Sequence, residues 1–228
     1  MTYNSKEQWI PHFKNLQLLL KKPTDIESIK TELLYLHSQL HQKEVHGLES
    51  PTYYDEVICD LNQSNFNISP TAKNMTAAWD LWHITRIEDL TTSILLCQDG
   101  QVFDEFRYKL GTDVTDTGNA MTDEEIFRLG SELSLENLLR YRKEVGKKTR
   151  KFIEKLTIEK LSRRFSNEAV CRIKNEGGVI PQTLWLMDYW GKKTVSGIIT
   201  MPMTKHQILH LNDVRDIILK YKKKQKRS

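Results

Sequence analysis

The chain has 228 residues, of which 39% are hydrophobic and 28% charged, so it is long enough to bury a core as one compact domain. Its formal net charge is +4, but residues 220–228 carry six Lys or Arg and no acid, which leaves 28 basic and 30 acidic residues elsewhere. A near-neutral body argues against specific nucleic-acid binding, and no run approaches the ~20 apolar residues of a membrane-spanning helix.

The first long helix is expected over residues 24–47. Thr24 and Glu27 have the spacing of a capping box at its start, and Gly47 ends it. The apolar positions recur with helical spacing, and an HxxxH pair, His37 and His41, lies at the margin of the apolar side.

The second long helix follows a turn-rich segment. Ser69 and Pro70 have the residue types of an N-cap and a first helical position, and the helix is expected to end near Gly100. His83 lies at the middle of its apolar stripe. The stripe consists of Ala72, Thr76, Trp79, His83, Ile87, Leu90, Ile94 and Cys97.

The central part of the chain predicts one short and one long helix. Thr122 and Glu125 form a capping box for the short helix, and residues 134–156 have the periodicity of the third long helix. Residues 157–182 contain NEGG and Pro181 and are expected to be irregular.

The last part of the chain predicts two more helices. Residues 183–200 are expected to form one helix, and Thr204 with Gln207 begins the final helix after Pro202. A 3.6-residue period places two histidines on the apolar face of that final helix. The face consists of Met203, His206, His210, Val214, Ile217 and Tyr221.

These elements predict an all-α fold, a four-helix bundle with extra N-terminal and short connecting helices and a site between the long helices. Residues 1–228 are expected to form a single domain. Residues 24–222 are its core, residues 1–23 an N-terminal extension, and residues 220–228 a solvated basic tail.

Three histidines on inward helix faces suggest a metal site. A single histidine there is more commonly a buried ring bonded to a backbone carbonyl or water. Three buried rings would each need a partner, whereas one divalent ion satisfies a nitrogen of all three. We therefore expect His83, His206 and His210 to be metal ligands, with coordination positions left open for chemistry.

Four further residues are candidates for an outer shell or a pocket wall: His37, Asp213, Glu88 and Trp79. The two acids have a simpler interpretation as solvated charges on helix faces. The aromatic residues Trp79, Trp82, Trp185, Tyr189 and Trp190 would wall a pocket above the ion or pack in the core. His12 and His46 are expected at the surface or in loops.

The cysteines and the N-terminus point to a reducing compartment. Cys59, Cys97 and Cys171 are far apart and form no CxxC, which argues against a disulfide framework or a zinc ribbon. The N-terminus lacks the pattern of a secretory signal. We expect a cytoplasmic protein with a small-molecule substrate and no membrane partner, and we keep a homodimer open as its assembly.

The segments WDLWHITRIED, around His83, and MPMTKHQILHLND, around His206 and His210, together resemble the DinB/YfiT-like superfamily of bacterial metalloenzymes. The resemblance spans most of the chain. It implies a four-helix bundle in which a histidine of the second helix and an HxxxH pair of the last helix hold a divalent metal. Those positions correspond to His83, His206 and His210.

The resemblance implies less about the reaction. Some members resemble metal-dependent thiol S-transferases that use bacillithiol, mycothiol or glutathione, and others are thiol-dependent isomerases. We expect Zn, Ni, Fe or Mn at the site and a low-molecular-weight thiol as cosubstrate of an S-transferase acting on small electrophiles. The alternatives are a metal-dependent hydrolase and a noncatalytic metal- or small-molecule-binding bundle of the stress response.

Overall fold

The computed structural model describes residues 5–69 and 75–227, and within those ranges the chain is helical with no strand. The expected all-α class is confirmed. Residues 164 and 194 form an isolated antiparallel bridge.

The elements in chain order are α1 (Ser5–Gln8), α2 (Ile10–Lys21), α3 (Ile26–Ser38), α4 (Lys43–His46), α5 (Tyr53–Ile58), α6 (Ala77–Asp89), the π-helix η1 (Leu90–Leu96), α7 (Phe103–Phe106), α8 (Asp123–Glu132), α9 (Leu135–Glu154), α10 (Ile158–Leu161), α11 (Asn167–Asn175), the 3-10 helix η2 (Pro181–Thr183), α12 (Trp185–Gly191), α13 (Val195–Thr200), the π-helix η3 (Met201–Lys205) and α14 (His206–Gln225).

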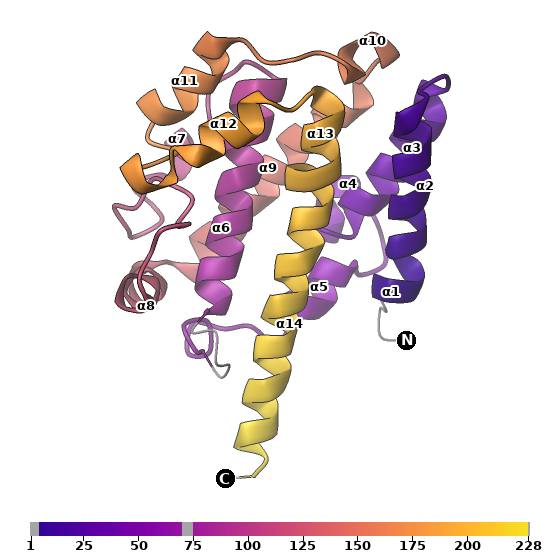
Figure 1. Cartoon of the computed structure of the whole chain (residues 1–228). Helices are drawn as coiled ribbons and strands as arrows, with labels where there is room; N and C mark the ends of the chain where they lie inside the picture. Colours follow the sequence, from indigo (N-terminus) through magenta and orange to yellow (C-terminus); the bar gives the residue numbers. More distant parts are fainter. Residues whose placement is uncertain (1–4, 70–74, 228) are drawn as a thin grey trace.

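The long helices pack around α6. Helix α6 contacts α14 on one side and α9 on another, and α9 also contacts α3. In Figure 1, α6 (magenta) and α14 (yellow) lie side by side and run in opposite directions. The N-terminal helix α2 packs against α3, and α11 and α12 cover the end of the molecule near η1. None of the helices in the described ranges is long and apolar enough to cross a membrane.

Helix α6 is buried on every side rather than along one stripe. Each of its residues from Ala77 to Asp89 is buried, including Asp80, Arg86 and Glu88. Burying a charge is costly unless it is paired and hydrogen-bonded. The polar side chains of α6 must therefore find partners on neighbouring elements, and these partners build the two histidine clusters described below.

The first long helix is shorter than expected. It begins at Ile26, and the Asp25 carboxylate, rather than Thr24, accepts hydrogen bonds from the first-turn backbone. It ends at Ser38, and α4 follows after a turn. Gly47 ends α4 with a φ of 65°, a left-handed conformation that glycine adopts without a steric penalty.

The second helix also begins later than expected. Thr76 is its N-cap, accepting a hydrogen bond from the backbone N–H of Trp79. Ser69 is not helical, and Pro70 lies outside the described residues. Beyond Asp89 the chain continues as the π-helix η1 and leaves the helix at Leu96, before Gly100.

The prediction for the central helices is confirmed in two places and wrong in two. Thr122 caps α8 through the expected capping box with Glu125, and α9 follows the predicted third long helix. Residues 157–182 are not simply irregular, because they contain α10 and α11. Residues 183–200 begin at the end of η2 and form α12 and α13 rather than one helix, since the chain turns at Thr194 to cap α13.

The final helix grows out of η3 without a new N-cap. The Thr204 hydroxyl donates a hydrogen bond to the carbonyl of Ile199, so the expected capping box with Gln207 is absent. Pro202 lies in η3 and has no N–H to continue a regular ladder, which accounts for a π-helical turn here. The tail is helical as far as Gln225 and is tied to the body by an ion pair between Lys222 and Asp60.

Candidate metal centre

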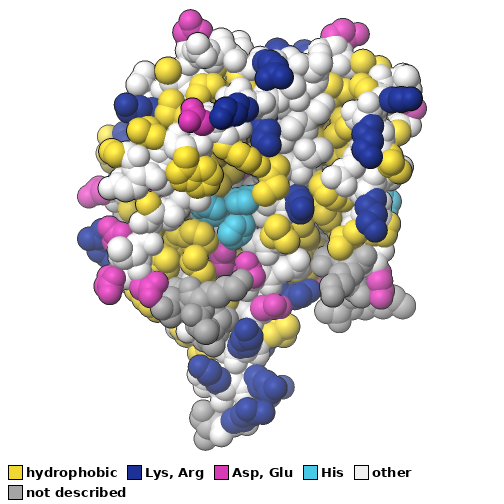
Figure 2. All heavy atoms as spheres, viewed as in Figure 1, with side chains coloured by type: hydrophobic (Ala, Val, Ile, Leu, Met, Phe, Trp, Pro, Cys, Tyr) yellow, Lys and Arg dark blue, Asp and Glu magenta, His cyan; other side chains and the backbone are white. Residues whose placement is uncertain are grey.

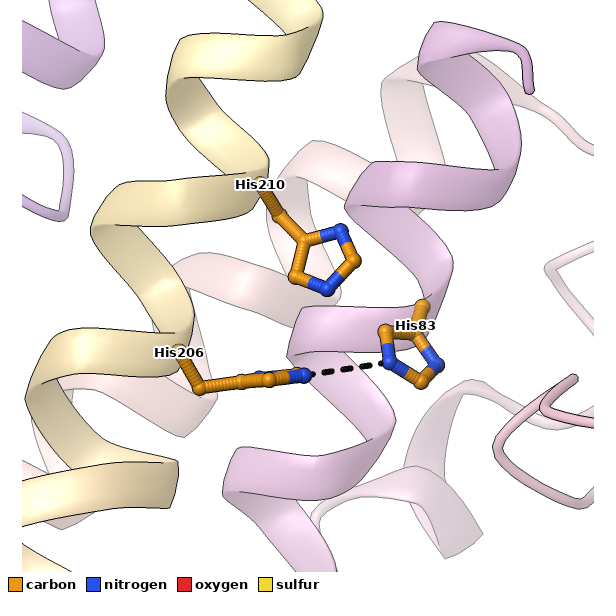
Figure 3. Close-up of side chains that lie close together, drawn as sticks. All are labelled: His83, His206 and His210. Carbon is orange, nitrogen blue, oxygen red and sulfur yellow. Dashed lines mark hydrogen bonds between the residues drawn. The ribbon is translucent and has the colours of Figure 1, made fainter. Parts of the chain in front are cut away.

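His83 of α6 meets His206 and His210 of α14 where the two helices pack. Ring nitrogens of all three lie within 4.8 Å of one another, and the Nε2 atoms of His83 and His206 are 3.2 Å apart. Figure 3 shows the three rings pointing toward a common point between the helices. We call this group the histidine trio.

Two contacts fix the ring of His83. Its Nδ1–H donates a hydrogen bond to the carbonyl of Thr117 at 2.7 Å, and because a carbonyl only accepts, Nε2 keeps its lone pair. Trp79 stacks on the ring with centroids 4.5 Å apart, and its Nε1–H donates to the carbonyl of Gly118. The loop after α7 and the aromatic residue one turn before His83 therefore hold its Nε2 toward the trio.

Asp80 orients His210. The Asp80 carboxylate accepts a hydrogen bond from Nδ1–H of His210 at 2.7 Å, which leaves Nε2 of His210 as the ligand atom. A carboxylate behind a histidine is the usual support of a metal ligand. Asp80 was missed in the sequence, although it lies three residues before His83 and therefore on a neighbouring position of the same helix surface.

The position of His206 fits a bound cation. Two imidazole nitrogens bound to one tetrahedral Zn²⁺ at about 2.0–2.1 Å would lie about 3.3 Å apart, close to the 3.2 Å between Nε2 of His83 and Nε2 of His206. Nδ1 of His206 is buried and has no hydrogen-bond partner among the described residues. The two facing nitrogens are thus placed as ligands of one ion would be.

The electrostatics keep these rings neutral. Burial, with a further contribution from the neighbouring His210, lowers the pKa of His83 to about 3. Burial and the two other rings hold the pKa of His206 well below its ordinary value. Neutral imidazole is the form that binds a metal ion, so His83 and His206 present lone pairs at neutral pH.

The trio is accessible from the surface. His83 is buried, with 3% of its surface exposed, whereas His206 and His210 are partly exposed. Figure 2 shows histidine side chains in a hollow on this face, with hydrophobic side chains along one border and acidic side chains along another. Asp213, one of the expected outer-shell residues, groups with Asp80 and His210 within the same 4.8 Å limit.

The structure corrects the expectations for Glu88 and His37. Glu88 is completely buried and is not a solvated charge on a helix face. It lies with His37 and His41 in a separate group, which we call the buried cluster. His37 Nε2 is 3.2 Å from the Glu88 carboxylate and His41 Nε2 is 3.1 Å from it.

The expectation for His46 was also wrong, because its ring is partly buried and Nε2 lies 2.8 Å from Nδ1 of His37. His37 therefore uses both ring nitrogens inside the buried cluster. It belongs to this cluster and not to the trio. The HxxxH spacing of His37 and His41 is the signal in the sequence that could have identified the cluster.

The charge of Glu88 is already balanced. The Arg142 guanidinium of α9 lies 3.9 Å from its carboxylate and also donates to Gln207 and to the carbonyl of Leu40. Burial alone would raise the pKa of Glu88, but the adjacent His41 and the hydrogen bonds from both histidines hold it well below the ordinary value. Burial lowers the pKa of His41 to about 3. The composition could hold a metal, but here both rings hydrogen-bond to one carboxylate oxygen and a guanidinium balances the charge of the carboxylate.

The aromatic residues divide between the two expected roles. Trp82 is buried in the core and donates to the carbonyl of Asp116. Trp79 supports His83, as described above. Three aromatic residues of α12 line a cavity that reaches His206, namely Trp185, Tyr189 and Trp190.

Comparison with known proteins gives one family. The model described as the DinB superfamily matches residues 48–214. No curated protein matches the chain. The matched segment contains His83, His206 and His210 and begins after His37, His41 and His46.

Proposed function

This chain belongs to the DinB superfamily, and from that premise we propose that His83, His206 and His210 hold a divalent metal ion as the centre of an enzyme. The observation that carries the proposal is the convergence of ring nitrogens from three histidines at a surface hollow. Three protein ligands leave coordination positions for a substrate. Imidazole suits Zn, Ni and Fe, and Mn stays a further candidate.

The bound ion would supply acidity, because a coordinated thiol is deprotonated outright and a coordinated water reaches a pKa of about 7. Residues around the trio orient its rings. Thr117 and Asp80 hold two of the rings with their Nε2 atoms toward the centre. Trp79 shields one face of His83 from water.

The reaction that we favour is transfer of a low-molecular-weight thiol to a small electrophile. The thiolate sulfur forms a bond to an electrophilic carbon, the bond from that carbon to its leaving group breaks, and the thiol proton passes to water. The resemblance of the two histidine segments to thiol S-transferases supports this choice, and so does a site open to small molecules. A cytoplasmic location accords with it, since all three cysteines are free thiols.

Metal-dependent hydrolysis is the second candidate. Asp213 is partly exposed and groups with Asp80 and His210 beside the trio, where a carboxylate could accept a proton from water. A noncatalytic metal-binding role is the third, and a site without turnover of any tested substrate would favour it.

The metal is tested by elemental analysis of the purified full-length protein. Wild type is expected to carry about one divalent ion per chain, and His206→Ala is expected to lose it. His12→Ala is the matched control, because His12 lies at the surface against Glu32. A wild-type protein without stoichiometric metal under metal-replete conditions would overturn the proposal.

The reaction is tested with the metal-loaded protein, glutathione or bacillithiol, and a chlorinated nitroaromatic acceptor. We expect conjugation above the rate of metal-free protein, and loss of that rate in His206→Ala. Release of product from an ester without thiol consumption would favour the hydrolase instead. A metal-loaded protein that accelerates neither reaction would remove both enzymatic candidates.

A further inference from the structure

An apolar cavity lies directly beside the histidine trio. It has a volume of about 150 Å³ and is formed between α12, the start of η3 and His206. The walls that matter here are Trp185, Leu186, Tyr189, Trp190 and Met201. Because His206 lines the cavity and also belongs to the trio, a molecule in the cavity would lie against the proposed metal centre.

The size and the walls of the cavity select a class of ligand. An apolar cavity of about 150 Å³ can hold one benzene ring. Aromatic walls favour another ring through stacked or edge contacts. The described residues lining the cavity include no Lys, Arg, Asp or Glu, so a charged group placed there would lose its hydration without gaining a counter-ion.

The cavity and the trio share a structural support. Asn119 lines the cavity, and its Oδ1 accepts a hydrogen bond from the hydroxyl of Thr117 at 2.7 Å. The carbonyl of the same Thr117 orients His83. One short loop therefore positions both a metal ligand and a polar group of the cavity wall.

We infer that this cavity binds the uncharged, ring-sized part of the electrophilic substrate and places its reacting carbon beside His206. The substrate class is a small electrophile with a single aromatic ring. The inference rests on the proposed function for its chemistry, but the binding of a ring in the cavity can be measured without turnover.

The binding test uses fluorobenzene and the full-length protein, followed by ¹⁹F NMR. Met201→Trp fills the cavity and is expected to weaken binding by about tenfold or more, because the ring loses its buried apolar surface. Leu184→Trp is the matched control, since Leu184 is exposed, precedes α12 and does not line the cavity. This control is expected to bind as wild type does.

A second variant guards against misfolding of the first. Trp185 is 55% exposed, so Trp185→Ala removes one wall with little effect on the core, and it is expected to weaken fluorobenzene binding as well. Equal binding by wild type and both cavity variants, or no binding by wild type, would overturn the inference.

A kinetic test separates the inference from the proposed function. With the metal-loaded protein, Met201→Trp should raise the KM for a chloronitrobenzene by a larger factor than the KM for iodoacetamide, which has no ring. If the protein binds the ring but carries no metal, the proposed function is contradicted and the inference about the cavity still holds. If the protein binds metal and conjugates both acceptors, but Met201→Trp changes both KM values equally, the inference about the cavity is contradicted and the proposed function still holds.

Discussion

The histidine trio and the buried cluster are built from the same parts and differ in their electrostatics. Each contains an HxxxH pair and receives a third residue from α6, which is His83 in the trio and Glu88 in the buried cluster. In the trio, ring nitrogens face one another at an accessible hollow. In the buried cluster, both rings hydrogen-bond to one carboxylate that has a guanidinium beside it.

The comparison shows that HxxxH spacing brings two rings together but does not decide what they bind. The Glu88 carboxylate is hydrogen-bonded to two ring nitrogens through Oε1, and the Arg142 guanidinium lies 3.9 Å from Oε2, so the charge of the carboxylate is balanced. Each group leaves one buried ring Nδ1 without a hydrogen-bond partner among the described residues, on His41 and on His206, but Nε2 of His206 faces another ring whereas Nε2 of His41 faces a carboxylate. The proposed metal site is therefore the trio, and we propose a structural role for the buried cluster.

Packing reinforces this difference. Helix α9 approaches the buried cluster so closely that a Cβ at Gly146 would lie 2.5 Å from Nδ1 of His41. Side chains and backbone thus enclose this group, with no exposed surface on His37, His41 or Glu88. A substrate has no access to it, whereas the trio borders both the solvent and the apolar cavity.

The largest effect that we expect comes from Glu88→Gln. Removing the carboxylate leaves the Arg142 charge buried without its partner, which should lower the free energy of unfolding by about 3–5 kcal/mol. Urea denaturation measures this change, and elemental analysis should show the same metal content per folded chain as in wild type. Glu44→Gln, at an exposed pair with Lys143, should change stability by less than about 1 kcal/mol.

Either of two results would contradict the structural role that we propose for the buried cluster. A Glu88→Gln protein as stable as Glu44→Gln would show that the buried cluster is not a structural ion pair. Loss of one metal equivalent in the Glu88→Gln protein, with His206→Ala still binding metal, would show that the buried cluster holds the ion.

The next effect should be seen in Asp80→Asn. The amide cannot fix the proton on Nδ1 of His210 as a carboxylate does, so metal affinity should fall about 10–100-fold. Competition with a coloured chelator measures the affinity. Asp216→Asn, at an exposed position of α14, is the control and should bind as wild type does. Unchanged affinity in Asp80→Asn would mean that His210 is not a ligand.

The smallest effect is on the pH dependence of stability in metal-free protein. His83 and His41 have folded pKa values of about 3, below the ordinary 6.5, so the unfolded chain binds more protons between these values. Stability should therefore fall as pH decreases from about 6.5, by about 1 kcal/mol per pH unit for each group. Urea denaturation at pH 7.5, 6.5 and 5.5 tests this, and the Glu88 contribution is lost only at lower pH.

Variants of the two groups should respond differently in this pH series. His41→Gln and His83→Gln should each reduce the slope, because each removes one buried ring that resists protonation. Saturating metal should raise the stability of wild type throughout the series and have little effect on His83→Gln, because the ion binds the folded trio. Stability that rises on acidification would contradict the burial of neutral rings in both clusters.

The sequence alone was sufficient for the all-α class, for the box that begins α8 and for the long helix α9, because these depend on local caps and periodicity. It also indicated His83, His206 and His210, since residues four apart on one helix are neighbours whatever the fold. Glu88 was misinterpreted because a helical period assumes one solvated face, and α6 has none.

Only the tertiary structure decided the partners of each ring. Asp80 and Thr117 fix His210 and His83 through contacts across 130 and 34 residues, and Glu88 reaches His37 across 51 residues. The break at Thr194 joins a local cap of α13 to a bridge with residue 164, and only the second of these depends on a distant segment. The local sequence sets which side chains lie together on one helix face. Burial and hydrogen bonding arise between distant segments of the chain. Those long-range contacts therefore determine whether a histidine faces a carboxylate or another histidine ring.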